Sequence, residues 1–235
     1  MDIILSSTLI VTLFPVFMCV GALVKIDSKG PIIFKQSRIG KDGNKFMIYK
    51  FRTMSSDNNV LKKDEPDHVT HIGRFLRKYG IDELPQLFNI FKGEMSFIGP
   101  RPHVFEYFQY YTKEQQKRLE VLPGMLGPNA CSIEKRTILN KNDLDIKYVN
   151  NLSLKQDIDI LCYTLSKAKL IFNSREASSF GNKKVFFSEI TMLKEQFEEE
   201  QQKNKKIETN SIDSLDETKK IKTPVLYKSK NKRIK

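Results

Sequence analysis

The amino-acid sequence predicts an α/β protein that is mostly helical, with a small β-hairpin and an N-terminal helix that inserts into a membrane and is broken at Pro15. Three observations lead to this class. The run from Ile3 to Val24 carries no charge, two apolar-rich runs flank an Asp-Gly turn near residue 42, and apolar residues recur at helical spacing after residue 70. A chain of 235 residues can hold one sizeable domain with additional segments.

The uncharged run is the membrane segment. Its 22 residues would form a helix of about 33 Å, enough for a hydrocarbon core of about 30 Å. No basic residue precedes the run and no small-residue cleavage site follows it, which argues against a signal peptide. Pro15 removes a helical hydrogen bond, so the segment either crosses with a kink or bends and returns to the same leaflet. Basic residues are dense from Lys25 onward, which places the rest of the chain on the cytoplasmic side.

A β-hairpin is predicted between Lys25 and Met54. The runs PIIFKQSRI and KFMIYKFRTM are joined by Lys41–Asn44, whose Asp-Gly pair is a turn signal. In a strand, Lys50 and Arg52 would share one face, and the intervening aromatic residues the other.

Residues 55–66 are polar and predicted to be a loop, and two short helices are predicted after it. Thr70 is a cap for a helix with apolar residues at helical spacing, and Gly80 ends it. A second helix starts at once and ends at Gly93. Pro85 is tolerated only in a first turn, so this helix should start near Asp82, with Asp82 at or beside the N-cap.

Further helices follow. Capping-box pairs at Thr112/Gln115 and Ser153/Gln156 open two of them, and the first is predicted to end at Pro123-Gly124. The apolar stripe of the second could pack on the core or lie on a membrane surface, and core packing is the favoured alternative. Residues 185–202 fit an amphipathic helix, and 203–235 are lysine-rich, aromatic-poor and expected to be disordered. The residues of the apolar stripe are Leu154, Ile158, Leu161, Leu165, Ala168 and Phe172.

The net charge of +12, from 40 basic and 28 acidic side chains, indicates an anionic partner such as nucleic acid, an anionic membrane face or a phosphorylated substrate. The three cysteines show neither CxxC nor zinc spacing, which indicates reduced thiols on the cytosolic side rather than a disulfide framework.

Candidate chemistry lies at Asp82 and Glu83. Capping and the helix dipole alone would explain two acids at a helix start. The alternative is that one carboxylate attacks phosphorus as a nucleophile and the other helps to hold Mg²⁺ together with substrate phosphates. Arg101 lies between two prolines that stiffen its backbone, and a guanidinium can grip a phosphate with two hydrogen bonds. Together these residues are typical of phosphoryl transfer beside a membrane.

Four stretches, which cover roughly residues 2–172, resemble the bacterial sugar transferases, the small monotopic phosphoglycosyl transferases. The third stretch ends in DELPQLFNIFKGEMSFIGPRP, which is highly specific for that family. The four stretches are DIILSS, GPIIFKQSRIGKDGNKFMIYKFRTM, THIGRFLRKYGIDELPQLFNIFKGEMSFIGPRP and YVNNLSLKQDIDILCYTL.

The resemblance implies an enzyme that moves a sugar-1-phosphate from a UDP-sugar to undecaprenyl phosphate. Asp82 would attack the β-phosphorus, release UMP and carry the phosphosugar, which the polyprenyl phosphate then takes. Glu83 would hold Mg²⁺ with Asp82 or orient the phosphates. The phosphate-binding residues would be Arg101 together with Lys50, Arg52 and Arg38.

The resemblance also implies an organisation. Residues 1–25 would be a membrane-inserted, re-entrant helix, 26–173 the phosphoglycosyl transferase catalytic domain with interfacial amphipathic helices, 174–202 an amphipathic helix and 203–235 a basic disordered tail. The catalytic domain would face the cytoplasm at the bacterial inner membrane. A homo-oligomer or downstream glycosyltransferases are further candidate partners, whereas no nucleic acid is expected.

Three departures from the family pattern stand out. Relatives usually have Ser-Pro at the helix break, whereas this chain has Phe14-Pro15, and relatives usually carry a few basic residues before the Asp that stands here at position 2. The PG-x-x-G element at 123–127 lacks the usual following Trp and Gln-Val. A catalytically degenerate relative that acts as a membrane-anchored interaction protein in a glycan-assembly complex is therefore the alternative function.

Overall fold

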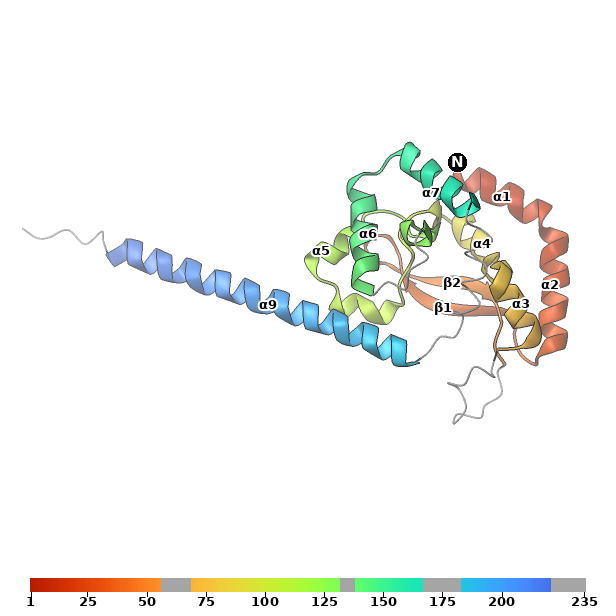
Figure 1. Cartoon of the computed structure of the whole chain (residues 1–235), viewed down its shortest axis with the longest axis horizontal. Helices are drawn as coiled ribbons and strands as arrows, with labels where there is room; N and C mark the ends of the chain where they lie inside the picture. Colours follow the sequence, from red (N-terminus) through yellow and green to blue (C-terminus); the bar gives the residue numbers. More distant parts are fainter. Residues whose placement is uncertain (56–68, 132–137, 167–182, 221–235) are drawn as a thin grey trace, which may run out of the picture. The chain divides into compact units, whose positions relative to one another are not determined.

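The computed structural model describes residues 1–55, 69–131, 138–166 and 183–220 (Figure 1). Met1–Lys194 form one compact unit and Glu195–Lys235 a second. The first unit is mostly helical and contains a small antiparallel hairpin, as the sequence predicts. Most of the loop predicted at residues 55–66 lies outside the described residues.

The N-terminal segment is two helices, α1 (Asp2–Thr12) and α2 (Phe14–Asp27), which meet at Leu13 at an angle of 63°. Pro15 lies in the first turn of α2, where its missing N–H costs no helical hydrogen bond. The Thr12 hydroxyl donates to the Thr8 carbonyl oxygen at 3.0 Å, just before the bend. Among the described residues no single helix meets the length and hydropathy criteria for a membrane span, and α1 and α2 meet them only as a bent pair.

The hairpin pairs β1 (Ile33–Ile39) with β2 (Lys45–Phe51) in an antiparallel register that sets Arg38 opposite Phe46. A 3₁₀ turn, Lys41–Gly43, joins the strands at the predicted place. The buried side chain of Asn89 connects β2 to α4 (Gln86–Phe91), because its carboxamide accepts from the Tyr49 N–H at 3.1 Å and donates to the Met47 carbonyl oxygen at 2.7 Å.

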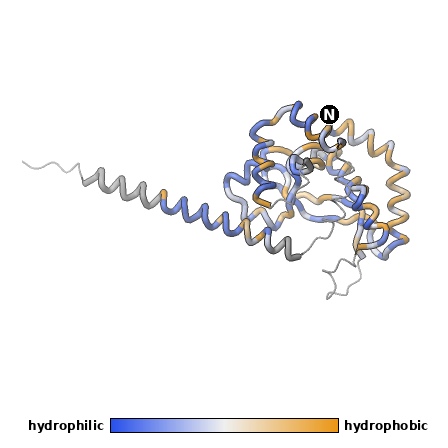
Figure 2. The backbone as a smooth tube through the Cα atoms, in the orientation of Figure 1, coloured by the Kyte–Doolittle hydropathy of each residue, from blue (hydrophilic) through white to orange (hydrophobic). Residues whose placement is uncertain are grey.

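The N-terminal helices pack on this hairpin rather than forming a separate body. Leu9, Leu13 and Phe17 lie against a core cluster that contains Phe46 and Ile48. Further along, Val20 and Val24 of α2 pack with Phe51 and Leu76. Figure 2 shows that α1 and α2 are apolar along much of their length. One side of these helices therefore packs on the core, and the other side is exposed in the part of the chain that the structure describes.

Helix α3 (His71–Tyr79) begins and ends where the sequence predicts. The Thr70 hydroxyl accepts from the Gly73 N–H at 2.9 Å, and Gly80 takes the left-handed conformation (φ 70°) that ends the helix. Gly73 must lack a side chain, because a Cβ there would lie 2.2 Å from the Thr53 carbonyl oxygen. The backbone at Thr53, just after the hairpin, therefore packs directly against α3.

A second strand pair, β3 (Ser96–Ile98) with β4 (Gly124–Leu126), is parallel and was not predicted. Both strands are only three residues long, too short for a pattern to identify them. Two glycines let the chains approach, since a Cβ on Gly124 would lie 2.2 Å from the Gly99 nitrogen.

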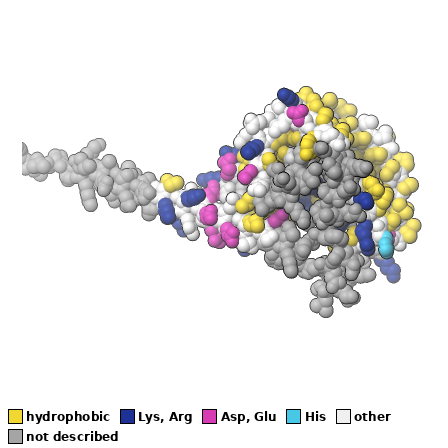
Figure 3. Space-filling model, in the orientation of Figure 1, with side chains coloured by type: hydrophobic (Ala, Val, Ile, Leu, Met, Phe, Trp, Pro, Cys, Tyr) yellow, Lys and Arg dark blue, Asp and Glu magenta, His cyan; other side chains and the backbone are white. Residues whose placement is uncertain are grey.

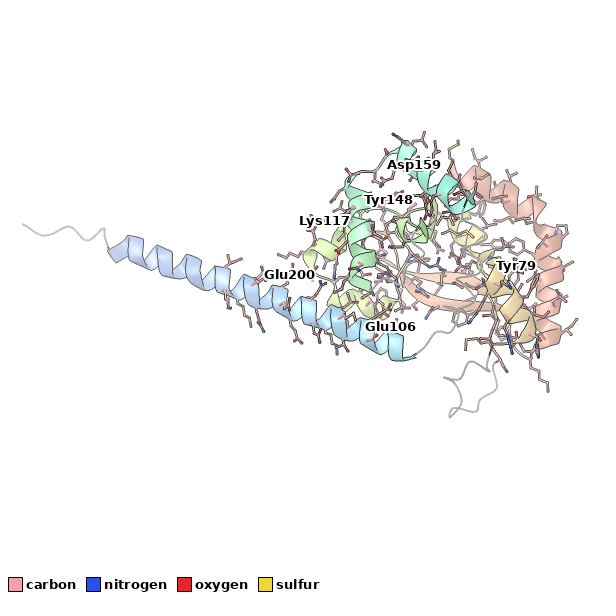
Figure 4. All side chains as sticks on the ribbon, viewed as in Figure 1. Tyr79, Glu106, Lys117, Tyr148, Asp159 and Glu200 are labelled. Carbon is pink, nitrogen blue, oxygen red and sulfur yellow. The ribbon has the colours of Figure 1, made fainter. Side chains whose placement is uncertain are left out.

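The helices that follow differ in part from the prediction. The Thr112/Gln115 capping box is present, but α5 (Lys113–Gln116) passes into a 3₁₀ turn, Lys117–Leu119, well before Pro123. Helix α6 (Ile138–Asn150) precedes α7 (Leu154–Ser166), where the Ser153 hydroxyl accepts from the Gln156 N–H at 3.2 Å. Tyr148 of α6 (labelled in Figure 4) donates to the Asp157 carboxylate of α7 at 2.6 Å.

The prediction that the apolar stripe of α7 packs on the core was wrong. Leu154, Ile158, Leu161 and Leu165 are 40–76% exposed, whereas Ile160, outside the stripe, is buried. The amphipathic pattern itself cannot tell a protein core from a membrane surface, since both take the same apolar face. Ala168 and Phe172 lie outside the described residues.

Helix α9 (Lys183–Lys220) contains the predicted helix 185–202 and continues through residues 203–220, for which the composition predicts disorder. The segment 183–220 has neither proline nor glycine to end a helix. At the start of α9, Leu193 is fully buried with Tyr107 and Tyr111, and Tyr107 donates to the Glu189 carboxylate at 2.7 Å. Residues 221–235 lie outside the described residues.

Candidate active site

Asp82 and Glu83 lie in a 3₁₀ turn, Ile81–Glu83, between α3 and α4. The left-handed Gly80 redirects the chain, and its carbonyl oxygen accepts from the Glu83 N–H at 3.2 Å. The predicted helix start near Asp82 was wrong, because α4 begins at Gln86 with Pro85 as its N-cap. Both acidic residues are buried, although Asp82 and Glu83 retain 9% and 6% exposure. Burial of two adjacent acids requires compensating positive charge.

Glu83 receives that charge from two residues that are far apart in the sequence. Its Oε1 accepts from Lys50 Nζ of β2 at 2.9 Å and is also hydrogen-bonded to the guanidinium of Arg101. The side chain of Glu83 is 8% exposed, whereas that of Arg101 is 50% exposed. Arg101 can therefore meet an incoming anion while Glu83 holds it from behind.

The electrostatics of these cations follow from burial and from the two acids. Burial lowers the pKa of Lys50, and the Glu83 carboxylate opposes that shift. The carboxylate of Glu83 raises the pKa of Arg101, with Asp82 acting in the same direction. Arg101 thus stays charged at physiological pH, and Glu83 limits the extent to which burial lowers the pKa of Lys50.

Arg77 also belongs to this group, although the sequence analysis assigned it no role. Its Nε donates to the Thr53 hydroxyl at 2.8 Å, and while burial lowers its pKa, the charge of Asp82 raises it. Asp82 thus lies within electrostatic reach of Arg77, Lys50 and Arg101. A signal was present: Arg77 lies in the last turn of α3, five residues before Asp82.

The Pro-Arg-Pro segment is held by its backbone. Each main-chain carbonyl oxygen from Pro100 to His103 accepts a hydrogen bond from another part of the fold. The donors are the Gly124 N–H to Pro100 (2.9 Å), an Arg118 guanidinium nitrogen to Arg101 (2.8 Å), an Arg38 guanidinium nitrogen to Pro102 (3.1 Å) and the Ile39 N–H to His103 (3.0 Å).

Two predicted phosphate-binding residues make contacts within the protein. Arg38 donates to the Pro102 carbonyl oxygen and, at 2.6 Å, to the Gln36 side chain, and burial lowers its pKa to about 10. Arg52 donates to the carbonyl oxygen and hydroxyl of Ser28 at 2.6 and 2.9 Å, at the end of α2. The structure therefore brings Lys50 and Arg101 to Glu83, but sends Arg52 toward the N-terminal helices. A phosphate contact by Arg38 or Arg52 stays a prediction.

The carboxylates of Asp82 and Glu83 are also the predicted ligands of Mg²⁺. No group of three or more His, Cys, Asp or Glu side chains suited to a metal occurs among the residues that the structure describes. Mg²⁺ is commonly bound by one or two carboxylates plus waters and substrate phosphates, so Asp82 and Glu83 fit that chemistry only with a substrate present. Glu83 already shares Oε1 between two cations.

His103 behind the arginine is held neutral. Arg118 can only donate, and it lies 2.7 Å from His103 Nδ1, while the Tyr111 hydroxyl lies at 2.6 Å, so Nδ1 is an acceptor. Burial and the charges of Arg118, Arg38, Lys141 and Arg101 lower the pKa of His103 well below its usual value. Protonation would set two cations side by side.

This arrangement predicts a loss of stability in acid. Because the folded-state pKa of His103 lies below the unfolded value of about 6.5, the unfolded state binds the extra proton first, and stability falls as pH drops through that window. The expected slope is about 1.4 kcal/mol per pH unit below pH 6.5. His103→Asn keeps an acceptor near Nδ1 without a titration. Thermal melts of both proteins from pH 7.5 to 5 check this, and equal slopes would contradict it.

A buried acid pair on a turn, with a lysine and a proline-flanked arginine on Glu83, fits a transferase that acts on phosphorylated substrates. The chain belongs to the bacterial sugar transferase family, whose model matches residues 1–170. The match ends before α9.

Curated relatives agree with this assignment. The chain is 42% identical over 171 residues to the uncharacterized sugar transferase EpsL of Bacillus subtilis (strain 168), which covers 69% of this chain and 80% of that protein. It is 36% identical over 179 residues to the UDP-glucose:undecaprenyl-phosphate glucose-1-phosphate transferase of Klebsiella pneumoniae, covering 71% of this chain and 38% of that protein. It is 34% identical over 187 residues to the UDP-N-acetylgalactosamine-undecaprenyl-phosphate N-acetylgalactosaminephosphotransferase of Aeromonas hydrophila, covering 74% and 44%. The chain thus spans less than half the length of the last two.

Proposed function

We propose that the protein transfers a sugar-1-phosphate from a UDP-sugar to undecaprenyl phosphate through a phosphosugar ester on Asp82, releasing UMP. The observation that carries this proposal is the buried Asp82–Glu83 turn with Lys50 and Arg101 on Glu83. The activities in the names of the Klebsiella and Aeromonas relatives support a UDP-sugar and undecaprenyl phosphate as the two substrates.

The reaction has two displacements. A carboxylate oxygen of Asp82 attacks the β-phosphorus, the bond from that phosphorus to the oxygen of UMP breaks, and UMP leaves. An oxygen of undecaprenyl phosphate then attacks the same phosphorus, the bond to the Asp82 oxygen breaks, and the lipid diphosphate sugar leaves with Asp82 restored. A carboxylate nucleophile splits one difficult transfer into two easier steps.

The other residues act on charge and position. Arg101, half exposed on Glu83, contacts the donor phosphates, and Lys50 balances the buried carboxylate beside them. Arg77 adds positive charge within electrostatic reach of the Asp82 carboxylate. Mg²⁺ held by Asp82, Glu83 and substrate phosphate oxygens would neutralise phosphate charge.

We also propose that the protein sits in the bacterial inner membrane by one leaflet, with the catalytic unit on the cytoplasmic face. The uncovered side of α1 and α2 is apolar, and Figure 3 shows hydrophobic side chains gathered along that edge of the unit. The exposed stripe of α7 and apolar residues of α3 and α4 add further exposed apolar side chains, and large exposed apolar patches mark sites that bind a protein or a membrane. The exposed residues include Ile4, Val11, Phe14, Met18, Leu23, Phe75, Phe91 and Leu154.

The test is a UMP-release assay on purified protein in detergent or nanodiscs. The donors are UDP-glucose and UDP-N-acetylgalactosamine, which the names of the Klebsiella and Aeromonas relatives contain, and UDP-galactose. Each is supplied with undecaprenyl phosphate. One donor should give UMP and a lipid diphosphate sugar in equal amounts. Absence of both products with every donor would refute the proposal.

Helix α9 favours a second candidate function, that of a scaffold in glycan assembly, because it lies beyond the family match. The boundary between the two compact units gives the position for a truncation that distinguishes the two functions. Deletion of residues 195–235 leaves the first compact unit complete, and we expect UMP release within about twofold of the full chain. Deletion from Lys183 also removes Leu193 and Glu189, so its melting temperature should fall. No UMP release by the full chain, together with loss of glycan assembly in cells on deletion of residues 195–235, would favour the scaffold.

A further inference from the structure

Behind the Pro-Arg-Pro segment lies a buried ion pair for which the proposed reaction has no use. Arg118 is 2% exposed and Asp145 is fully buried, and a guanidinium nitrogen of Arg118 is hydrogen-bonded to an Asp145 carboxylate oxygen. The other Asp145 oxygen accepts from the Asn129 side chain at 2.8 Å. Asp145 belongs to α6 and Arg118 to the 3₁₀ turn Lys117–Leu119, so the pair joins two elements that lack a residue of the proposed chemistry.

The same guanidinium reaches the site through the backbone. The Arg118 nitrogen that meets Asp145 also donates to the Arg101 carbonyl oxygen at 2.8 Å, and the other nitrogen donates to the Tyr111 hydroxyl at 2.6 Å. Arg118 therefore holds Arg101 by its main chain, while Glu83 holds Arg101 by its side chain. Among the residues that the structure describes, no other side chain is hydrogen-bonded to both the Asp145 carboxylate and the Arg101 carbonyl oxygen.

Stability alone is a weak reason for such a pair. Taking two charges out of water costs nearly as much as their attraction returns, and apolar replacements of buried pairs are often neutral or stabilising. Positioning is a better reason. The Arg101 side chain is half exposed and is held at its far end by Glu83, so the position of its guanidinium also depends on where its backbone is held.

We propose that Arg118, set by Asp145, is the positioning residue that holds the backbone of Arg101 so that its guanidinium faces Glu83 and the donor phosphates. This inference rests on the proposed function. Arg118 touches neither substrate nor nucleophile and acts only through Arg101. A displacement of about 1 Å in a phosphate-binding group can cost about 100-fold in rate, so the position of the carbonyl matters.

The experiment is a double-mutant cycle on kcat/KM for UMP release in the full chain. Arg118→Lys keeps a positive charge beside Asp145 but cannot make all four contacts. We expect it to lower kcat/KM about 100-fold, and Arg101→Ala to lower it about 100- to 1,000-fold. In the Arg101→Ala background, Arg118→Lys should change kcat/KM by less than about threefold, because its route to the site is gone. Lys117→Met, which removes an exposed neighbouring charge (Figure 4), is the matched control and should leave kcat/KM unchanged.

Local hydrogen exchange gives a readout that does not depend on activity. Arg118→Lys should speed amide exchange in residues 99–104 by about tenfold or more and leave α3 unchanged. Equal losses from Arg118→Lys in both backgrounds, or unchanged exchange in residues 99–104, would overturn the proposal. If the wild-type protein releases no UMP from any donor, the proposed function fails, and the exchange measurement alone decides whether Arg118 holds the segment.

Discussion

Asp82→Asn is expected to lower UMP release about 1,000-fold or more, while the protein stays folded. The substitution keeps the size and hydrogen-bonding shape of the side chain in its buried turn, but a carboxamide is not a nucleophile toward phosphorus. Removal of a covalent nucleophile typically leaves only the rate that binding and charge stabilisation provide. Initial rates of UMP formation at saturating donor check this, with far-ultraviolet circular dichroism to confirm folding.

Asp159→Asn is the matched control for this prediction. Asp159 lies on α7 (Figure 4) and is exposed, so the same change of charge there should leave the rate unaltered. UMP release by Asp82→Asn at more than about a tenth of the wild-type rate would show that Asp82 is not the nucleophile.

Glu83→Gln should lower kcat/KM about 100- to 1,000-fold, because one carboxylate oxygen now holds both Lys50 and Arg101. Without that negative charge, burial and Arg101 both lower the pKa of Lys50 with little opposition. Lys50 then loses its proton at a lower pH. The alkaline limb of the activity profile should therefore move to lower pH in Glu83→Gln, which kcat/KM measured from pH 6 to 10 will reveal.

Glu106→Gln is the control, because Glu106 is exposed (Figure 4) and the substitution removes the same charge away from Lys50. An unshifted alkaline limb in Glu83→Gln, with activity near wild type, would mean that Glu83 does not govern Lys50.

The local signals predicted the fold well where one residue type has one physical use. Thr70 and Gly80 bound α3, the Asp-Gly pair gives the hairpin turn, and Pro15 predicts the break, which lies two residues earlier at Leu13 because proline is accepted in a first turn. The pairing of Lys50 with Glu83 was not predicted, since residues 33 positions apart leave no mutual pattern in one sequence. The family resemblance implied only that Lys50 binds phosphate.

Contacts over long distances account for what the sequence did not predict. Arg38 and Arg52 are as basic in the sequence as Lys50, yet the fold turns their guanidinium groups onto the Pro102 carbonyl oxygen and onto Ser28. The role of Arg118 depends on Asp145, on another helix, and the pairing of β3 with β4 depends on the close approach of Gly99 and Gly124. Each of these depends on which elements meet, and that information is absent from local spacing.

The central claim, a phosphosugar ester on Asp82, is tested most directly by a single turnover without acceptor. Protein in excess is mixed with UDP-sugar labelled with ³²P at the β-phosphorus, quenched within seconds, digested and analysed by mass spectrometry. The account predicts one equivalent of UMP per labelled protein, label on the peptide that contains Asp82, and loss of the label when undecaprenyl phosphate is added. UMP release only in the presence of acceptor, with no label on the protein at any time, would contradict it.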